Sequence, residues 1–198
     1  KADTAFSRSN QIFDTTIGWR FINPKIEASF GVDSMPETAD NVASEYKVAK
    51  ADQDAFALRS QQRWAAANAA GIFANEILPV HIEQQRGDTI VIDQDEHPRP
   101  KTSLEKLNKL GGINGPKSTV TAGNASGVND GAAALLLASK KGLETHGLKS
   151  IARILGVAAA GVAPRIMGIG PVPATRKVMA MTGLAIDDMD VIEINEAF

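Results

Sequence analysis

The residues best suited to chemistry are a carboxamide and a carboxylate, Asn195 and Glu196, which directly follow the apolar run 191–194. Such a run, rich in β-branched residues, predicts a buried strand. Since ligands of α/β folds bind at the carboxyl ends of strands, this is a favourable place for catalysis. The Asn195 amide can donate a hydrogen bond to a developing oxyanion, or fix a water that does so. The alternative is a strand-end cap whose amide bonds only its own turn.

Two loops of small residues are further candidate sites. The first has the sequence Gly-Asn-Ala-Ser-Gly at 123–127, where a ligand can approach the backbone N–H groups and the Ser126 hydroxyl. A tight turn is the alternative, and a serine nucleophile is not indicated because Ser126 has no evident base. The second loop, 167–173, lacks the third glycine of a dinucleotide-binding loop, so phosphate binding of that type is not expected. Met167 at its start is more typical of a core residue than of a ligand contact.

Positive charge gathers at Arg99 and Lys101, with Lys106 and Lys109 a turn or two later. Charge at this density usually marks a solvated helix face. The alternative is a site for the phosphates of an anionic ligand, which Arg99 can engage through two parallel hydrogen bonds. Because the net charge of the chain is −2, an anionic ligand depends on such a local cluster.

The composition excludes several classes of function. The 198 residues suffice for one large domain or parts of two, and 43% hydrophobic with 22% charged residues is ordinary for a soluble globular protein. A slightly acidic chain without a long apolar run is not expected to bind nucleic acid or membranes, and we expect a cytoplasmic location. The absence of cysteine excludes disulfides, thiolate metal sites and a cysteine nucleophile within these residues. The three histidines, His81, His97 and His146, are too scattered to predict a metal site.

Periodicity and turn residues predict the elements that position these sites. After an irregular segment at 1–36, we expect helices at 39–47, 53–70, 103–110, 140–146 and 173–183. Thr38 and Asp52 are suitable N-caps for the first two helices, and Gly71 and Gly147 are suitable stops. Strands are expected at 77–82 and 89–93, joined as a hairpin, and at 118–122, 151–157 and 191–194. Residues 131–137 fit a strand or a helix, and the β-α-β alternation after residue 150 predicts a mostly parallel sheet.

Two signatures in combination resemble the thiolase family. One is the sequence Thr-Val-Thr-Ala-Gly-Asn-Ala-Ser-Gly-Val-Asn-Asp-Gly-Ala-Ala-Ala-Leu-Leu-Leu-Ala-Ser at 119–139, and the other is Asn-Glu-Ala-Phe at 195–198. The segments 38–43 and 168–174 add to the resemblance, which covers essentially the whole chain. The segments most similar to thiolases that act on 3-oxoadipyl-CoA in aromatic degradation are 7–8, 15–24 and 32–38.

The resemblance implies an acyltransferase with an α/β, thiolase-like layered fold. Thiolases join or cleave 3-oxoacyl-CoA and acetyl-CoA through an acyl-cysteine intermediate, with coenzyme A as a substrate and no further cofactor. Asn195 is then a catalytic residue that holds the water of an oxyanion hole, and Ala197 and Phe198 line the same pocket. The residues implied to contact CoA or the acyl group are Ala125 and Ser126 at the pantetheine arm, Ala122 and Met167 along its channel, Arg99 near the adenine and phosphates, and Met35 beside the acyl group.

The resemblance also implies an internal piece of such an enzyme, in which the layered fold is incomplete. Residues 1–128 correspond to the CoA-binding loop domain, 129–150 to the end of the N-terminal half, with a strand at 131–137, and 151–198 to the start of the C-terminal half. The family's nucleophilic cysteine lies upstream of the matching region, and its Gly-His-Pro histidine and second cysteine lie downstream. We therefore expect the isolated chain to be inactive and to expose apolar surface where sheet strands are missing. CoA thioesters are the expected partners, and a homotetramer is expected for the full-length enzyme.

Two alternatives stay open. A non-catalytic CoA-binding module would bind CoA without cysteine chemistry even at full length. A condensing enzyme of the ketoacyl-synthase type shares the fold, but it uses a histidine near position 195, where this chain has asparagine. The second alternative is therefore the weaker of the two.

Overall fold

The computed structural model describes Phe6, Ile12 and residues 18–198. The resembling residues 7–8 and 15–17, and most of the segment before residue 18 that is predicted to be irregular, lie outside the described residues. Contacts divide the chain into two compact units. The first unit comprises Lys1–Val42 and Val128–Asn195, and the second comprises Ala43–Gly127 and Glu196–Phe198. The division of the family fold into a loop domain and two halves, with limits at 128 and 150, stays a prediction.

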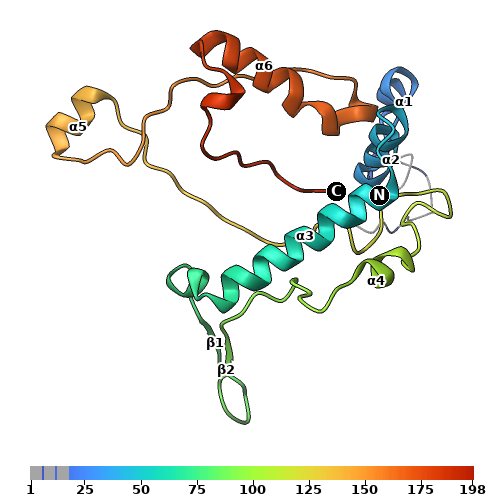
Figure 1. The fold of residues 1–198 in the computed structure, drawn as a ribbon, viewed down its shortest axis with the longest axis horizontal. Coiled ribbons are helices and arrows are strands. Elements are labelled where there is room, and N and C mark those ends of the chain that lie inside the picture. The colour runs from blue at the N-terminus through green and yellow to red at the C-terminus, as the bar shows by residue number, and fades with distance from the viewer. Residues whose placement is uncertain (1–5, 7–11, 13–17) are drawn as a thin grey trace. The chain divides into compact units, whose positions relative to one another are not determined.

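The second unit is built on α3 (Lys50–Ala69), the long helix in Figure 1. Its sequence is rich in Ala, Gln and Arg, which have high helix propensity, and the chain leaves the helix at Gly71, which adopts a left-handed φ of 71°. The helix predicted at 53–70 is thus confirmed, although it begins earlier. Asp52 therefore lies inside the first turn, and the prediction that it caps the helix is wrong, because the N-cap position is occupied by Ala49. A short turn of 3₁₀ helix, η1 (Ile72–Asn75), follows.

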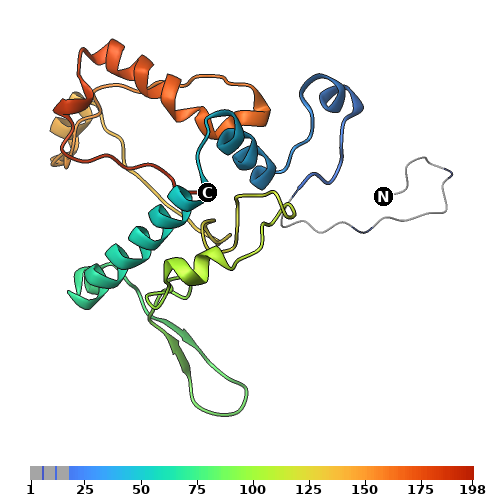
Figure 2. The same cartoon turned by 45° about the vertical axis from the view of Figure 1, so that its right-hand side comes forward.

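The strands β1 (Val80–Ile82) and β2 (Ile90–Ile92) form the predicted antiparallel hairpin. Val80 pairs with Ile92 and Ile82 with Ile90, around a loop in which Gly87 has a φ of 114°. Figure 2 shows this hairpin projecting from the segment that follows α3. Its strand residues are all exposed, so the hairpin contributes nothing to the core of the described structure.

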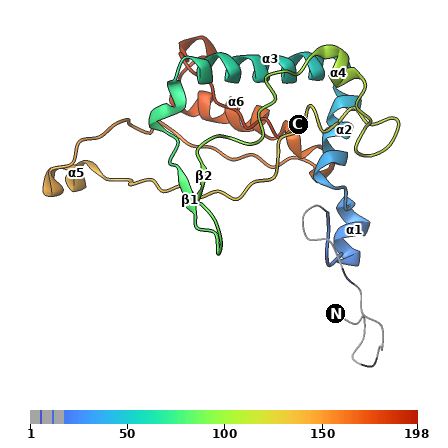
Figure 3. The same ribbon diagram turned by 90° about the horizontal axis from the view of Figure 1, so that it is seen from below.

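The core of the second unit lies where α3, α4 (Leu104–Asn108) and the segment 119–121 meet. Figure 3 shows α4 beside the N-terminal end of α3. The hydroxyl of Ser103 accepts from the Lys106 N–H and caps α4, which confirms the predicted helix in a shorter form. The strand predicted at 118–122 is wrong. Thr121 makes one isolated bridge to Gly112, and its carbonyl then accepts from the Asn124 N–H, which closes a turn and ends the pairing.

The first unit carries the elements α1 (Pro24–Phe30), α5 (Lys140–His146), η2 (Pro164–Ile169), α6 (Pro171–Thr182) and η3 (Ile186–Asp188). α5 matches the prediction at both ends, because Ser139 caps it and Gly147 stops it with a φ of 60°. α6 begins slightly before the predicted position and ends at Gly183. α1 forms within a segment predicted to be irregular, since Asn23 accepts a capping bond from the Lys25 N–H and a proline occupies the first helical turn.

The helix α2 (Met35–Glu45) begins before the helix predicted at 39–47, and Thr38 is not its N-cap. Thr38 lies inside the first turn, where its hydroxyl donates to the Met35 carbonyl at 2.7 Å. The cap is at Ser34, whose carbonyl accepts from the Thr38 N–H and whose own N–H donates to Glu37 Oε2 at 2.6 Å. The hydrogen bonds from Ser34 lower the pKa of Glu37 below its ordinary value.

The segment 156–159 contacts α6 within the first unit. Gly156 permits this close approach, because a Cβ at that position would lie 2.7 Å from Thr182 Cγ2 and 3.2 Å from Val178 Cγ2. Lys177 on the same helix donates from Nζ to the Ala159 carbonyl at 3.3 Å. The segment is therefore held against α6 by packing and by a side-chain hydrogen bond, without becoming a strand.

The apolar segments 131–137, 151–157 and 191–194 are not strands in the described part of the chain, so those predictions are wrong here. Leu135 is 90% exposed and Ile154 is 64% exposed. An extended segment becomes a strand only when a neighbour pairs with its backbone, and within residues 18–198 these segments have no such neighbour. The mostly parallel sheet is therefore not formed in these residues, whereas the predicted exposure of apolar surface is confirmed. Of the helices described, none has the length and apolar content to cross a membrane.

Candidate functional site

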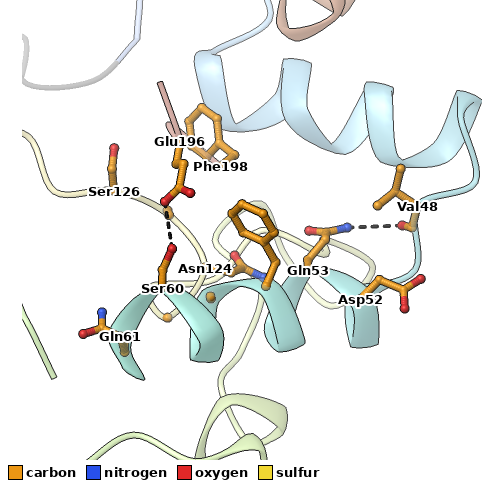
Figure 4. A pocket seen from close by; sticks show the side chains of 13 residues that line it. Val48, Asp52, Gln53, Ser60, Gln61, Asn124, Ser126, Glu196 and Phe198 are labelled. Carbon is orange, nitrogen blue, oxygen red and sulfur yellow. Dashed lines mark hydrogen bonds between the residues drawn. The ribbon is translucent and has the colours of Figure 1, made fainter. Parts of the chain in front are cut away.

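A cavity of about 500 Å³ in the second unit brings together α3, the loop 123–126 and residues of the segment 196–198. The residues that α3 supplies are Asp52, Gln53, Phe56, Ala57, Ser60 and Gln61. These positions recur mostly at the three- and four-residue spacing of one helix face, so a single face of α3 forms one wall. Figure 4 shows this wall opposite the loop and the segment 196–198.

The loop wall is shaped by the side chain of Asn124. Its Oδ1 accepts from the Thr121 N–H at 2.7 Å, and its Nδ2 donates to the Thr119 carbonyl at 2.9 Å. Both ends of the amide are therefore used to close the turn. The turn presents Ala125 and Ser126 to the cavity, and their contact with a ligand stays a prediction.

Glycines at either end of the loop permit close contacts. Gly123 packs on Leu107 of α4 and on Leu110, which follows this helix; a Cβ would meet the Leu107 side chain and lie 2.6 Å from Leu110 Cδ1. Gly127 packs on the imidazole of His97, where a Cβ would lie 2.8 Å from Nε2. A side chain at either position must displace these groups, so packing favours glycine at both ends of the loop.

Glu196 and Phe198 form the third wall, and two hydrogen bonds hold the segment in place. Ser60 Oγ donates to Glu196 Oε2 at 2.9 Å, as Figure 4 shows. The Ser126 N–H donates to the Ala197 carbonyl at 3.0 Å. The two sequence signatures, far apart along the chain, therefore meet at one cavity.

A buried carboxylate lies behind the loop. Asp54 on α3 is 0% exposed; its Oδ2 pairs with Lys50 Nζ at 2.6 Å, and its Oδ1 accepts from Asn124 Nδ2 at 3.1 Å. Lys50 also donates to the Leu107 carbonyl of α4 at 3.3 Å. Sequence analysis does not identify Asp54 or Lys50 as site residues. Their i, i+4 spacing is the available signal, but this spacing is common on solvated helix faces.

Arg99 lies beside the cavity without lining it. Its backbone N–H donates to Gln61 Oε1 at 2.7 Å. Its Nη1 donates to the carbonyls of Glu96, His97 and Pro98 at 2.6, 2.9 and 3.0 Å. The guanidinium therefore stabilises its own turn here, and its contact with phosphates stays a prediction.

Ala197, whose carbonyl accepts from the Ser126 N–H, does not line this cavity, and its predicted contact with the ligand stays a prediction. Four other predicted site residues do not line it either. Ala122 is exposed within the second unit. Met35, at the start of α2, and Met167, in η2, are exposed and belong to the first unit. Asn195 is also exposed and is assigned to the first unit. The roles of these four residues in catalysis and ligand contact stay predictions.

The charge of the cavity limits what it can bind. Among the described residues that line it, the charged ones are Asp52 and Glu196, and the rest are apolar or neutral. This lining suits an uncharged chain that carries amide groups, and it disfavours phosphate. In the part of the chain that the structure describes, no group of three or more His, Asp or Glu residues is placed to hold a metal ion.

The N-terminal domain of thiolases matches residues 9–141, and the C-terminal domain of thiolases matches residues 148–198. The chain therefore belongs to the thiolase family. It is 64% identical over 198 residues to a beta-ketoadipyl-CoA thiolase of Pseudomonas putida. It is 57% identical to the 3-oxoadipyl-CoA/3-oxo-5,6-dehydrosuberyl-CoA thiolase of Escherichia coli (strain K12). Each match covers 100% of this chain and 49% of the relative, so the chain spans about half the length of these relatives.

Solved thiolase structures have the same fold. The acetyl-CoA acetyltransferase of Bacillus anthracis is similar with a TM-score of 0.80 at 37% identity, covering 98% of this chain and 48% of that one. The human mitochondrial 3-ketoacyl-CoA thiolase in complex with CoA is similar with a TM-score of 0.74 at 46% identity, covering 83% of this chain and 40% of that one. The fold is therefore the α/β, thiolase-like layered fold, of which this chain forms a part.

Proposed function

We propose that this chain is part of an acyltransferase of the thiolase type, and that its second unit binds the pantetheine arm of CoA. The observation that carries the proposal is the 3.0 Å hydrogen bond from the Ser126 N–H to the Ala197 carbonyl, which joins the two thiolase signatures at one cavity. We also propose that the full-length enzyme is a cytoplasmic homotetramer, as the family resemblance implies.

The cavity favours the arm of CoA over its nucleotide. Pantetheine is an uncharged chain with amide groups, and the cavity offers Ser60, Gln61 and Ser126 as hydrogen-bonding partners between apolar walls. The Glu196 carboxylate disfavours phosphate in the same space. The phosphates therefore extend beyond the cavity toward Arg99, whose backbone is bonded to Gln61.

For the acyl group we propose a 3-oxoadipyl chain, the substrate in the names of relatives that are 64% and 57% identical. This acyl chain ends in a carboxylate. The described lining of the cavity in the second unit carries no basic side chain to pair with it. We therefore place the carboxylate outside this cavity, and we propose Met35 as a neighbour of the acyl group because the family resemblance implies it.

The proposed reaction is thiolysis of a 3-oxoacyl thioester, or its reverse. A cysteine thiolate attacks the 3-oxo carbonyl, the bond between C2 and C3 breaks, and acetyl-CoA leaves as its enolate, which takes up a proton. The thiol of CoA then loses its proton and attacks the acyl-enzyme, which releases the cysteine and forms the new acyl-CoA. Since this chain has no cysteine, the nucleophile belongs to the remainder of the enzyme. Asn195 holds a water whose O–H stabilises the negative charge that develops on the thioester oxygen.

Steady-state kinetics of the full-length protein test this proposal. We expect thiolysis of 3-oxoadipyl-CoA with a kcat/KM about tenfold or more above that for acetoacetyl-CoA, because the relatives that are 64% and 57% identical are named for the 3-oxoadipyl substrate. Ser126→Trp fills the cavity and is expected to raise KM for CoA by about tenfold or more. Glu105→Trp, at a side chain of α4 that is 77% exposed, is the matched control and leaves KM unchanged. CoA binding without thiolysis of either substrate would favour the non-catalytic CoA-binding module instead.

A further inference from the structure

We propose that Asp54 is a positioning residue of the CoA cavity, which acts through Asn124 to fix the backbone of Ala125 and Ser126. Asp54 itself does not line the cavity, whereas the other three residues do. The inference rests on the proposed function, because it takes the ligand of the cavity to be CoA.

The surroundings of Asp54 indicate that its carboxylate orients another side chain. A buried carboxylate is costly unless its charge and its hydrogen-bonding capacity are satisfied. Asp54 is 0% exposed, and both oxygens are occupied, one by Lys50 Nζ at 2.6 Å and the other by Asn124 Nδ2 at 3.1 Å. An apolar side chain of similar size would fill the space without this desolvation cost. The carboxylate adds what an apolar group lacks, a fixed acceptor for the Asn124 amide.

Asn124 transmits this constraint to the loop. One N–H of its Nδ2 is directed to Asp54 and the other to the Thr119 carbonyl, at 3.1 and 2.9 Å. Its Oδ1 accepts from the Thr121 N–H at 2.7 Å. With both donors and the acceptor in use, the amide has a single favourable orientation. Because Ser126 follows two residues later, the position of its hydroxyl and N–H depends on that orientation.

Lys50 fixes the carboxylate in turn. Its Nζ bonds to Asp54 Oδ2 and to the Leu107 carbonyl, so α3 and α4 hold the ammonium together. The contacts form a continuous path from Leu107 through Lys50 and Asp54 to Asn124. Asn124 is the member of this path that reaches the cavity, so the residues behind it position the site without touching the ligand.

The test uses the full-length enzyme and two ligands that are parts of CoA. Pantetheine reports on the arm that we place in the cavity, and adenosine bisphosphate, which lacks this arm, reports on the nucleotide end. Asp54→Asn keeps the shape of the side chain but removes the charge that holds Lys50. We expect it to weaken pantetheine binding and to raise KM for CoA by about tenfold, with kcat at saturating CoA within about twofold of wild type. Binding of adenosine bisphosphate, measured by calorimetry, should be unchanged.

A matched control separates this role from a general loss of structure. Glu105→Gln breaks another i, i+4 pair, Lys109 with Glu105, whose side chains are 72% and 77% exposed, and it should change neither ligand's affinity. If Asp54→Asn weakened the binding of pantetheine and of adenosine bisphosphate equally, the inference would be overturned, because a positioning residue of the cavity affects binding of the pantetheine arm alone.

A double-mutant cycle with Asn124→Ala tests the path itself. If Asp54 acts through Asn124, the double variant loses no more pantetheine affinity than the weaker-binding single variant. If the losses of pantetheine affinity in the two single variants multiply in the double variant, the inference is overturned. It is also overturned if Asp54→Asn binds pantetheine with wild-type affinity. Wild-type enzyme that binds neither CoA nor pantetheine would overturn the proposed function, and this inference with it.

Discussion

Ser60 Oγ donates to Glu196 Oε2 at 2.9 Å, and so links α3 to a residue 136 positions further along the chain. The contact keeps the segment 196–198 on the face of α3 that carries Phe56, and it orients a carboxylate at the cavity. The hydrogen bond is exposed to solvent, so its net contribution to folding is small. Its effect is therefore expected in ligand affinity.

Ser60→Ala in the full-length protein is expected to weaken CoA binding about threefold to fivefold, because it releases one of the two tethers of the segment 196–198. Isothermal titration calorimetry measures this change. Ser150→Ala, at an exposed serine of the other unit, is the control and should bind CoA as wild type does. Unchanged affinity in Ser60→Ala would show that the Ser126 tether alone suffices.

Gly127→Ala is expected to destabilise the protein by about 1–3 kcal/mol, because the added Cβ meets the His97 ring. Urea unfolding measures the loss. Gly131→Ala is the matched control, since nothing lies within 4 Å of a Cβ at that position. The double variant Gly127→Ala/His97→Ala removes the obstructing ring and should recover part of the loss. If the double variant is no more stable than Gly127→Ala alone, the ring is not the cause.

The stability contributed by Glu37 should depend on pH. Hydrogen bonds from Ser34 lower its pKa in the folded protein below the ordinary 4.5, so the ionised form stabilises the fold. This contribution is fully present above the ordinary pKa and is lost as the pH falls through the folded-state pKa. Glu37→Gln should therefore be less stable than wild type at neutral pH, and the difference should narrow as the pH falls below 4.5.

Urea unfolding of wild type and Glu37→Gln across this range measures the difference. Glu193→Gln, which removes an exposed carboxylate elsewhere in the first unit, is the matched control. A constant difference between wild type and Glu37→Gln at all pH values would contradict the capping role of the carboxylate.

The 198-residue chain by itself should have no thiolase turnover, because it contains no cysteine to form the acyl-enzyme. The assay follows thioester cleavage with a sample whose length is confirmed by mass spectrometry. Full-length enzyme in the same assay is the positive control. Turnover by the verified chain would contradict the acyl-cysteine mechanism that we propose.

Elements whose stabilising contacts come from residues nearby in the sequence are predictable from this sequence. The cap Ser139 and the stop Gly147 define α5, and the hairpin needs only its own two strands. Thr38 fails as a cap because Ser34, with Glu37 three residues later, satisfies more of the first turn of α2. The strand predicted at 131–137 fails because a ladder needs a partner, and the described residues provide none for it.

The candidate site is predictable in part. Ala125, Ser126 and Phe198 are identified from the sequence because the family signatures contain them. They line the cavity, and their contact with a ligand stays a prediction. Asp54 is not predictable from sequence. It has the pattern of an ordinary polar residue on α3, and it becomes buried only through packing that includes Asn124, 70 positions away.

The exposed leucines at 135–137 affect the self-association of the isolated chain in solution. An extended apolar segment with an unpaired backbone is a template for strand addition by a second molecule. Copies of the isolated chain should therefore associate as the protein concentration rises, and light scattering should increase before any ligand is added. A preparation of this chain should consequently keep its colloidal stability longer when it is stored dilute than when it is concentrated.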